Sequence, residues 1–151
     1  MRFSTSSVSF LLAMTLIAAM PSVVFANGRD GCDLTVSEAW IRAAPPMAAV
    51  HAGYATLVND GTKPLRIVAA SSSAFASVEM HETTEENGIS KMRALRSLTI
   101  VPHTTVKFEP GGKHFMLKDA TRPLSAGDRV VVSLTDAAGC TATASFVVRA
   151  Q

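Results

Sequence analysis

Residues 77–95 read SVEMHETTEENGISKMRAL, an alternating pattern that is interrupted once, by Asn87-Gly88. Asn-Gly between two alternating segments is a strong short-range signal for a two-residue type I′ turn. Such a turn makes the two flanking residues face each other and thereby fixes the register of the whole hairpin. The sequence therefore predicts a β-hairpin in which Thr83 lies opposite Met92.

This register sorts the side chains of the hairpin onto two faces. Directly opposed residues share a face, and successive residues alternate between faces. His81 and Met92 are then diagonal neighbours on one face, with Cα atoms about 7–8 Å apart. Val78, Met80 and Leu95 fall on the other face, which is more apolar and is predicted to face the core.

Turn signals recur at short intervals along the rest of the chain: Asn59-Asp60-Gly61, Pro110-Gly111-Gly112, Ala126-Gly127-Asp128 and Ala138-Gly139. The segments between them alternate with period two, as strands with one buried face do. The pattern predicts seven to nine short antiparallel strands, and hence an all-β, single-domain β-sandwich with Greek-key connections. Residues 43–49, which contain Pro45-Pro46, are predicted to form an irregular loop.

A second strand carries the same pair of residue types. In His114-Phe115-Met116-Leu117, the apolar Phe115 and Leu117 have the parity of a buried face. His114 and Met116 would then point together to the opposite face, away from the core. Two strands are thus expected to present a histidine and a methionine each on an exposed, non-core face.

The first 26 residues read as a secretory signal peptide, cleaved after Ala26. Between Val8 and Met20 only Ser9 and Thr15 are not apolar, a run too short to span a bilayer. Arg2 precedes the run, and small residues stand at the cleavage site. Residues 27–151 would form the mature domain. The formal net charge of +2 gives no electrostatic reason to expect nucleic acid or an anionic membrane as a partner, and no second apolar run is long enough to predict membrane insertion.

The two cysteines are predicted to form a disulfide, because an exported protein meets an oxidising compartment. Cys32 stands just before the first expected strand and Cys140 just before the last, so a bridge would tie the ends of the domain together. Lipidation of Cys32 is the weaker alternative. Arg29-Asp30 occupies positions where a lipobox needs small and apolar residues.

Two imidazoles and two thioethers form a soft, uncharged ligand set. Soft sulfur ligands select Cu(I), and a thioether survives oxidising conditions better than a thiolate. His81, Met92, His114 and Met116 are therefore the candidate ligands of a Cu(I) site. Because histidine must lose its proton to bind metal, affinity should weaken as pH falls through about 6.5.

The remaining histidines and methionines have simpler interpretations. Met80 fits a core residue by parity, and His103 fits a surface turn beside Pro102. Met47 and His51 could be auxiliary ligands or ordinary loop residues, and both interpretations stay open. The glutamates near His81 could help hold Cu(II) or guide a partner, although acidic residues at a strand end are more often solvated surface; they are Glu79, Glu82 and Glu85.

The spacing of these residues resembles the signature of the PCu(A)C family of periplasmic copper chaperones. Ten residues separate His81 from Met92, twenty-one separate Met92 from His114, and His114-Phe115-Met116 is a His-x-Met. Residues 39–46 (AWIRAAPP), Gly53-Tyr54 and residues 111–117 (GGKHFML) are similar to flanking segments of that family. Some members carry a His/Met-rich C-terminal tail, and the last four residues of this sequence, 148–151 (VRAQ), contain neither histidine nor methionine.

The resemblance implies a cupredoxin-like sandwich that binds one Cu(I) through His81, Met92, His114 and Met116. It also implies a role in delivering copper toward the CuA subunit of cytochrome c oxidase, often alongside a Sco-type thiol protein. We expect a monomeric periplasmic Cu(I) carrier that is not an enzyme, because a neutral, exposed site favours carriage over catalysis. Copper buffering or resistance through the same site is the alternative. A blue-copper carrier would need a cysteine near its histidines, and motifs of hydrolases are absent from the sequence.

Overall fold

The computed structural model describes residues 32–45 and 48–150, which contain ten β-strands and no helix. The predicted signal peptide and Met47 lie outside the described residues. The strands are β1 (Leu34–Arg42), β2 (Val50–Asn59), β3 (Leu65–Ser71), β4 (Phe75–Glu86), β5 (Ile89–Ala94), β6 (Leu98–Ile100), β7 (Thr105–Phe108), β8 (Lys113–Ala120), β9 (Arg129–Asp136) and β10 (Thr141–Arg149). In this described part, no helix is long and apolar enough to cross a membrane.

Eight of the strands close into a ring, in the order β4-β8-β7-β2-β1-β10-β9-β3, with β3 pairing back to β4. β5 and β6 lie outside the ring, on β4 and β3 respectively. The predicted all-β, single-domain architecture is confirmed, as a closed barrel-like sandwich. The predicted number of seven to nine strands was too low, since the described residues contain ten. The expectation of antiparallel strands was wrong for two pairings, because β1 with β10 and β7 with β8 pair in parallel.

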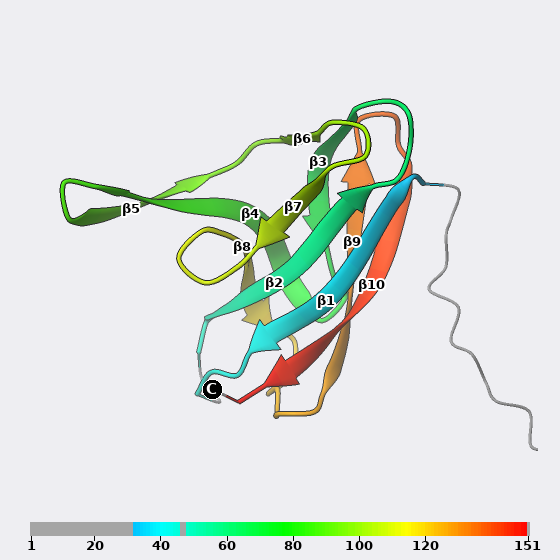
Figure 1. Cartoon of the computed structure of the whole chain (residues 1–151). Helices are drawn as coiled ribbons and strands as arrows, with labels where there is room; N and C mark the ends of the chain where they lie inside the picture. Colours follow the sequence, from blue (N-terminus) through cyan, green and yellow to red (C-terminus); the bar gives the residue numbers. More distant parts are fainter. Residues whose placement is uncertain (1–31, 46–47, 151) are drawn as a thin grey trace, which may run out of the picture.

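The hairpin of β4 and β5 projects from the body of the molecule (Figure 1). Its register is the predicted one, with Thr83 opposite Met92 and Glu86 opposite Ile89. Asn87 and Gly88 both have positive φ, at 53° and 75°, as a type I′ turn requires. The alternating pattern and one turn dipeptide thus place Met92 correctly relative to His81.

The core lies inside the ring and is built from the predicted parity. Phe115 is fully buried, stacked on Phe108 at 4.3 Å between ring centroids and edge-on to Phe146 at 5.8 Å. Val78 and Met80 are buried on the same side, and Leu95 packs against them from the edge. The predicted core face of the hairpin is therefore confirmed, and the neighbouring face of β4 and β8 is left for the histidines.

The two cysteines form a disulfide between Cys32 and Cys140, whose Cα atoms are 5.7 Å apart. They precede β1 and β10, which pair as neighbouring parallel strands. The predicted bridge is confirmed, and its sulfur atoms take no part in the region around His81. The bond also leaves no free thiol on Cys32 for a lipid thioether.

Candidate metal centre

The four candidate ligands come from three adjacent strands. His81 lies on β4, Met92 on β5, and His114 and Met116 on β8, in the strand order β5-β4-β8. His81 and His114 are directly opposed in the antiparallel pairing, and their ring centroids are 5.9 Å apart. Hairpin register and strand pairing together bring the two histidines side by side.

The two methionines share a cavity with one of these histidines. Met92, His114 and Met116 line one cavity of about 230 Å³, together with Arg42, Ala44, Val50, His51 and Ala52. Met116 lies opposite Glu79 on one neighbouring strand and Ala52 on the other. His81 is not part of the cavity wall but lies next to it, across from His114. The structure thus gathers the predicted set at one place.

The prediction that this set lies on an exposed face was wrong for the histidines. His81 and His114 are only 9% and 8% exposed, and Met116 is half-buried, whereas Met92 is 54% exposed. The reason is topological, because β4 and β8 each have strands paired on both sides, while β5 is an edge strand. The imidazoles are therefore covered, and one thioether is open to solvent.

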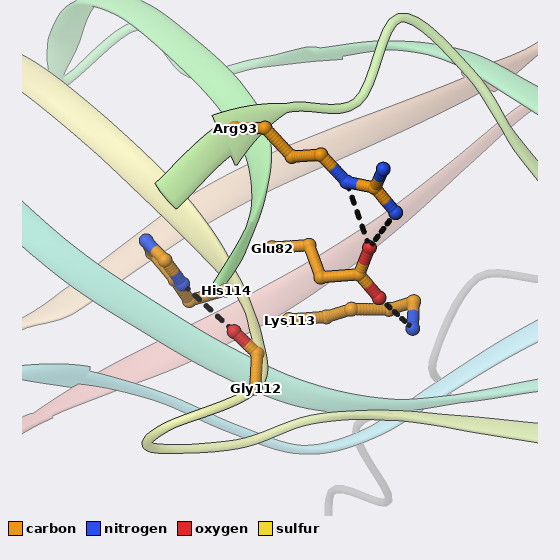
Figure 2. Close-up of polar contacts among 5 residues, drawn as sticks. All are labelled: Glu82, Arg93, Gly112, Lys113 and His114. Carbon is orange, nitrogen blue, oxygen red and sulfur yellow. Dashed lines mark hydrogen bonds and ion pairs between the residues drawn. The ribbon is translucent and has the colours of Figure 1, made fainter. Parts of the chain in front are cut away.

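The hydrogen bonding of His114 fixes its tautomer. Its Nδ1 lies 3.1 Å from the backbone oxygen of Gly112, as Figure 2 shows. A carbonyl oxygen can only accept, so Nδ1 carries the proton and Nε2 keeps a free lone pair. The same Gly112 oxygen accepts the backbone N–H of Thr83 at 3.1 Å, which ties β4 to the loop before β8. His114 can therefore offer Nε2 to a metal ion.

His81 has the opposite arrangement. Its Nε2 lies 2.9 Å from Oε2 of Glu79, and its Nδ1 is buried with no hydrogen-bond partner. Glu79 also accepts a hydrogen bond from Nζ of Lys118 at 2.7 Å. Two hydrogen bonds lower the pKa of the Glu79 carboxyl below its ordinary value, the one from Lys118 more than the one from His81. A buried nitrogen without a partner is costly unless something else satisfies it.

Glu82 lies on the opposite face of β4 from Glu79 and His81. Its carboxylate accepts hydrogen bonds from Arg93 at 2.6 Å and from Lys113 at 2.7 Å, as Figure 2 shows. These two cations, Lys113 foremost, lower the pKa of Glu82. Glu82 is therefore part of a surface ion-pair network, whereas Glu79 faces the histidines. Glu85 is exposed near the hairpin turn.

The structure also places the other described histidines and methionine. Met80 is 4% exposed in the core, on the face of β4 away from His81, and His103 is exposed in a turn, so both core and surface predictions are confirmed. His51 lies on β2 opposite the core residue Leu117, and its ring packs edge-on to Phe75 at 5.5 Å. Burial lowers the pKa of His51. His51 therefore lies in a strand rather than in a loop, between the end of the core and the cavity it helps to line, and its Nδ1 is also buried without a hydrogen-bond partner.

Sequence reasoning missed Arg42 as a residue of this site. Arg42 lines the cavity with Met92 and Met116, and its guanidinium carbon lies 5.7 Å from the centre of the Tyr54 ring. Its Nε is buried without a hydrogen-bond partner. Arg42 lies within residues 39–46, which resemble a segment of the PCu(A)C family, but a single arginine in a predicted strand gives no separate indication of a site.

The donor types present favour a soft metal ion. Across residues 32–45 and 48–150, no three His, Cys, Asp or Glu side chains gather as they would for zinc or calcium. What gathers is a pair of imidazoles, each with one nitrogen available, beside two thioethers. Such a set suits Cu(I), which prefers soft sulfur ligands and also binds imidazole.

Known proteins are similar to this chain in sequence and in fold. Residues 34–148 match the family described as "Putative lipoprotein LpqE-like". The "Putative lipoprotein Lxx21020" of Leifsonia xyli subsp. xyli (strain CTCB07) is 31% identical over 148 residues, which cover 97% of this chain and 88% of that protein.

Two solved structures resemble the barrel closely. The "Copper-bound PCuAC domain from PmoF2" has a TM-score of 0.66 at 22% identity, over 79% of this chain and 94% of that one. The "Solution structure of CuI-DR1885 from Deinococcus Radiodurans" has a TM-score of 0.60 at 28% identity, over 78% of this chain and 77% of that one. The resemblance to PCu(A)C proteins is thereby confirmed. The chain belongs to the LpqE-like family and has the cupredoxin-like fold of PCuAC domains.

Proposed function

We propose that this protein binds one Cu(I) ion through His81, His114, Met92 and Met116 and carries it without catalytic turnover. The observation that carries the proposal is the histidine pair. Two opposed imidazoles on neighbouring strands use different nitrogens for their hydrogen bonds, Nε2 in His81 and Nδ1 in His114, and the Nδ1 of His81 is buried with nothing to bond. A copper ion between the rings would satisfy that nitrogen. Similar structures that are described as bound to copper support the same ion.

The thioethers would complete the coordination from the two sides of the pair. Met116 is held within the sheet, whereas Met92 stands on an exposed edge strand. A neutral site with one exposed ligand can exchange copper with a partner more readily than a closed thiolate site. This property favours transfer over storage, and delivery toward the CuA centre of cytochrome c oxidase is the specific role we propose. The disulfide and the lipoprotein relatives support an exported protein.

A competition titration tests the site directly. Cu(I) is titrated against a chromophoric chelator with the protein and with His81→Ala, Met92→Leu, His114→Ala and Met116→Leu. Each variant should bind more weakly, by at least about tenfold for the histidines, because each imidazole supplies one of the four ligands. Matched controls are Met80→Leu, a buried methionine one residue from His81, and His103→Ala, an exposed histidine. Unchanged affinity in all four ligand variants would overturn the assignment.

Deleting the gene separates delivery from buffering. Delivery predicts loss of cytochrome c oxidase activity that added copper restores, with copper tolerance close to normal. Lost tolerance together with normal oxidase activity would show that the same site serves buffering.

A further inference from the structure

Glu79 and His81 lie on the same face of β4, two residues apart, and are joined by a hydrogen bond of 2.9 Å to Nε2 of the histidine. The carboxylate is ionised and can only accept, so the proton of the neutral imidazole must sit on Nε2. The lone pair is then left on Nδ1, the atom that is buried and has no partner. Reversing the tautomer would bury an unpaired N–H at the same position and remove the lone pair.

The carboxylate itself is held in place from β8. Nζ of Lys118 lies 2.7 Å from Oε1 of Glu79, while Oε2 bonds the histidine, so each oxygen has one donor. Glu79 is directly opposite Met116 in the strand pairing, which places this carboxylate on the face of β4 that carries His81, with 40% of its side chain exposed. Lys118 therefore leaves Glu79 one oxygen, aimed at His81.

We propose that Glu79 is a positioning residue that fixes the His81 tautomer, so that copper binds at Nδ1 of His81 and at Nε2 of His114. This inference rests on the proposed function and adds to it which nitrogen each histidine uses. Outer hydrogen bonds of this kind commonly set the orientation and tautomer of a metal-binding histidine, and losing one typically costs 10–100-fold in metal affinity.

Glu79→Gln is the informative substitution because it keeps the size of the side chain. Lys118 is donor-only and would claim the amide oxygen, which leaves the amide NH₂ to donate to Nε2 of His81. The proton would then move to Nδ1. Adding Lys118→Met frees the amide to rotate and accept from Nε2, which should restore the original tautomer. Glu82→Gln is the matched control, since Glu82 also bonds two donors but lies on the opposite face of β4.

The tautomer is read in the copper-free protein by long-range ¹H–¹⁵N correlation of the imidazoles, and affinity by the same Cu(I) competition. We expect Nε2–H in the parent protein and in Glu82→Gln. Glu79→Gln should shift to Nδ1–H with a 10–100-fold loss of Cu(I) affinity, and the double variant should recover most of both. Thermal unfolding of each variant verifies that it is folded.

Two outcomes would overturn the inference. An unchanged His81 tautomer in Glu79→Gln is one, and parent-like Cu(I) affinity in a variant whose tautomer has switched is the other. Both are distinguishable from failure of the proposed function, which would appear as unchanged affinity in His81→Ala and the other ligand variants.

Discussion

The proposed ligands divide between two parts of the molecule that differ in burial. His81, His114 and Met116 lie on β4 and β8, within the closed ring of strands, and the histidines are almost fully covered. Met92 lies on β5, in the hairpin arm of residues 83–94 that projects from the ring (Figure 1), and every residue of β5 is exposed. Local stability follows buried contacts, so the ring should hold its ligands rigidly while the arm opens more easily. The site would then combine a fixed half and an exchangeable half.

If the ring is the rigid part of the molecule, the stability of the fold should depend on its closure. Removing the disulfide should therefore lower the free energy of unfolding the most. Replacing both cysteines by alanine removes a link across 108 residues between the starts of two neighbouring strands. The chain-entropy model gives a loss of about 4–5 kcal/mol in the free energy of unfolding. Urea unfolding of the oxidised protein and the double variant measures it. A loss below about 1 kcal/mol would mean that the ring does not need this closure.

Phe115 should come next, because it is the core residue between His114 and Met116. It is fully buried and packs on Phe108 and Phe146. Phe115→Ala should cost about 3–5 kcal/mol, the usual range for removing a buried aromatic ring. Urea unfolding measures this loss, and Cu(I) affinity should fall as well, since the strand that holds both ligands loses its anchor. A cost near zero would contradict a rigid ring half.

Local rules were enough to predict the hairpin half of the site. One turn dipeptide fixes the register of β4 and β5, and period-two alternation then assigns Met80 to the core and His81 to the other face. The His-x-Met on β8 follows from the same alternation. These inferences depend on near neighbours in the sequence, where backbone geometry alone decides which side chains share a face.

Long-range pairing could not be predicted in this way. Nothing local says that β8 pairs with β4 in the register that sets His114 opposite His81, or that β5 is left at the edge. The burial of the histidines follows from that pairing, and the position of Arg42 in the cavity wall follows from the pairing of β2 with both β8 and β1. Asn59 gives another example. Its turn signal was correct, but its buried amide also donates to the backbone oxygen of Ile100, 41 residues away.

His51 tests where the core ends and the metal centre begins. Burial lowers the pKa of His51 below 6.5, so below that pH the unfolded chain takes up the proton more readily than the folded one. The contribution of neutral His51 to the free energy of unfolding is therefore fully present above pH 6.5. It is lost as pH falls through the lowered pKa, and the free energy of unfolding then drops by at most about 1.4 kcal/mol per pH unit. His51→Gln should flatten the pH dependence of unfolding between pH 7 and 5.

The Cu(I) affinity of His51→Gln at pH 7 tests whether His51 is also a copper ligand. It should match that of the parent protein, because the ring packs on Phe75 even though His51 also lines the cavity, and the four proposed ligands remain in place. Weaker binding together with an unchanged pH profile would make His51 an auxiliary ligand.

The arm should show the smallest effect on stability. Met92→Leu and Ile89→Ala alter side chains that are 54% and 63% exposed, and surface changes of this kind usually stay within about 0.5 kcal/mol. Urea unfolding should therefore not distinguish either variant from the parent. Cu(I) competition should distinguish the two variants, because Met92→Leu removes a thioether ligand and Ile89→Ala does not. If Met92→Leu instead destabilised the copper-free protein by more than 1 kcal/mol, the arm would be packed on the ring, and the exchangeable half of the site would have to lie elsewhere.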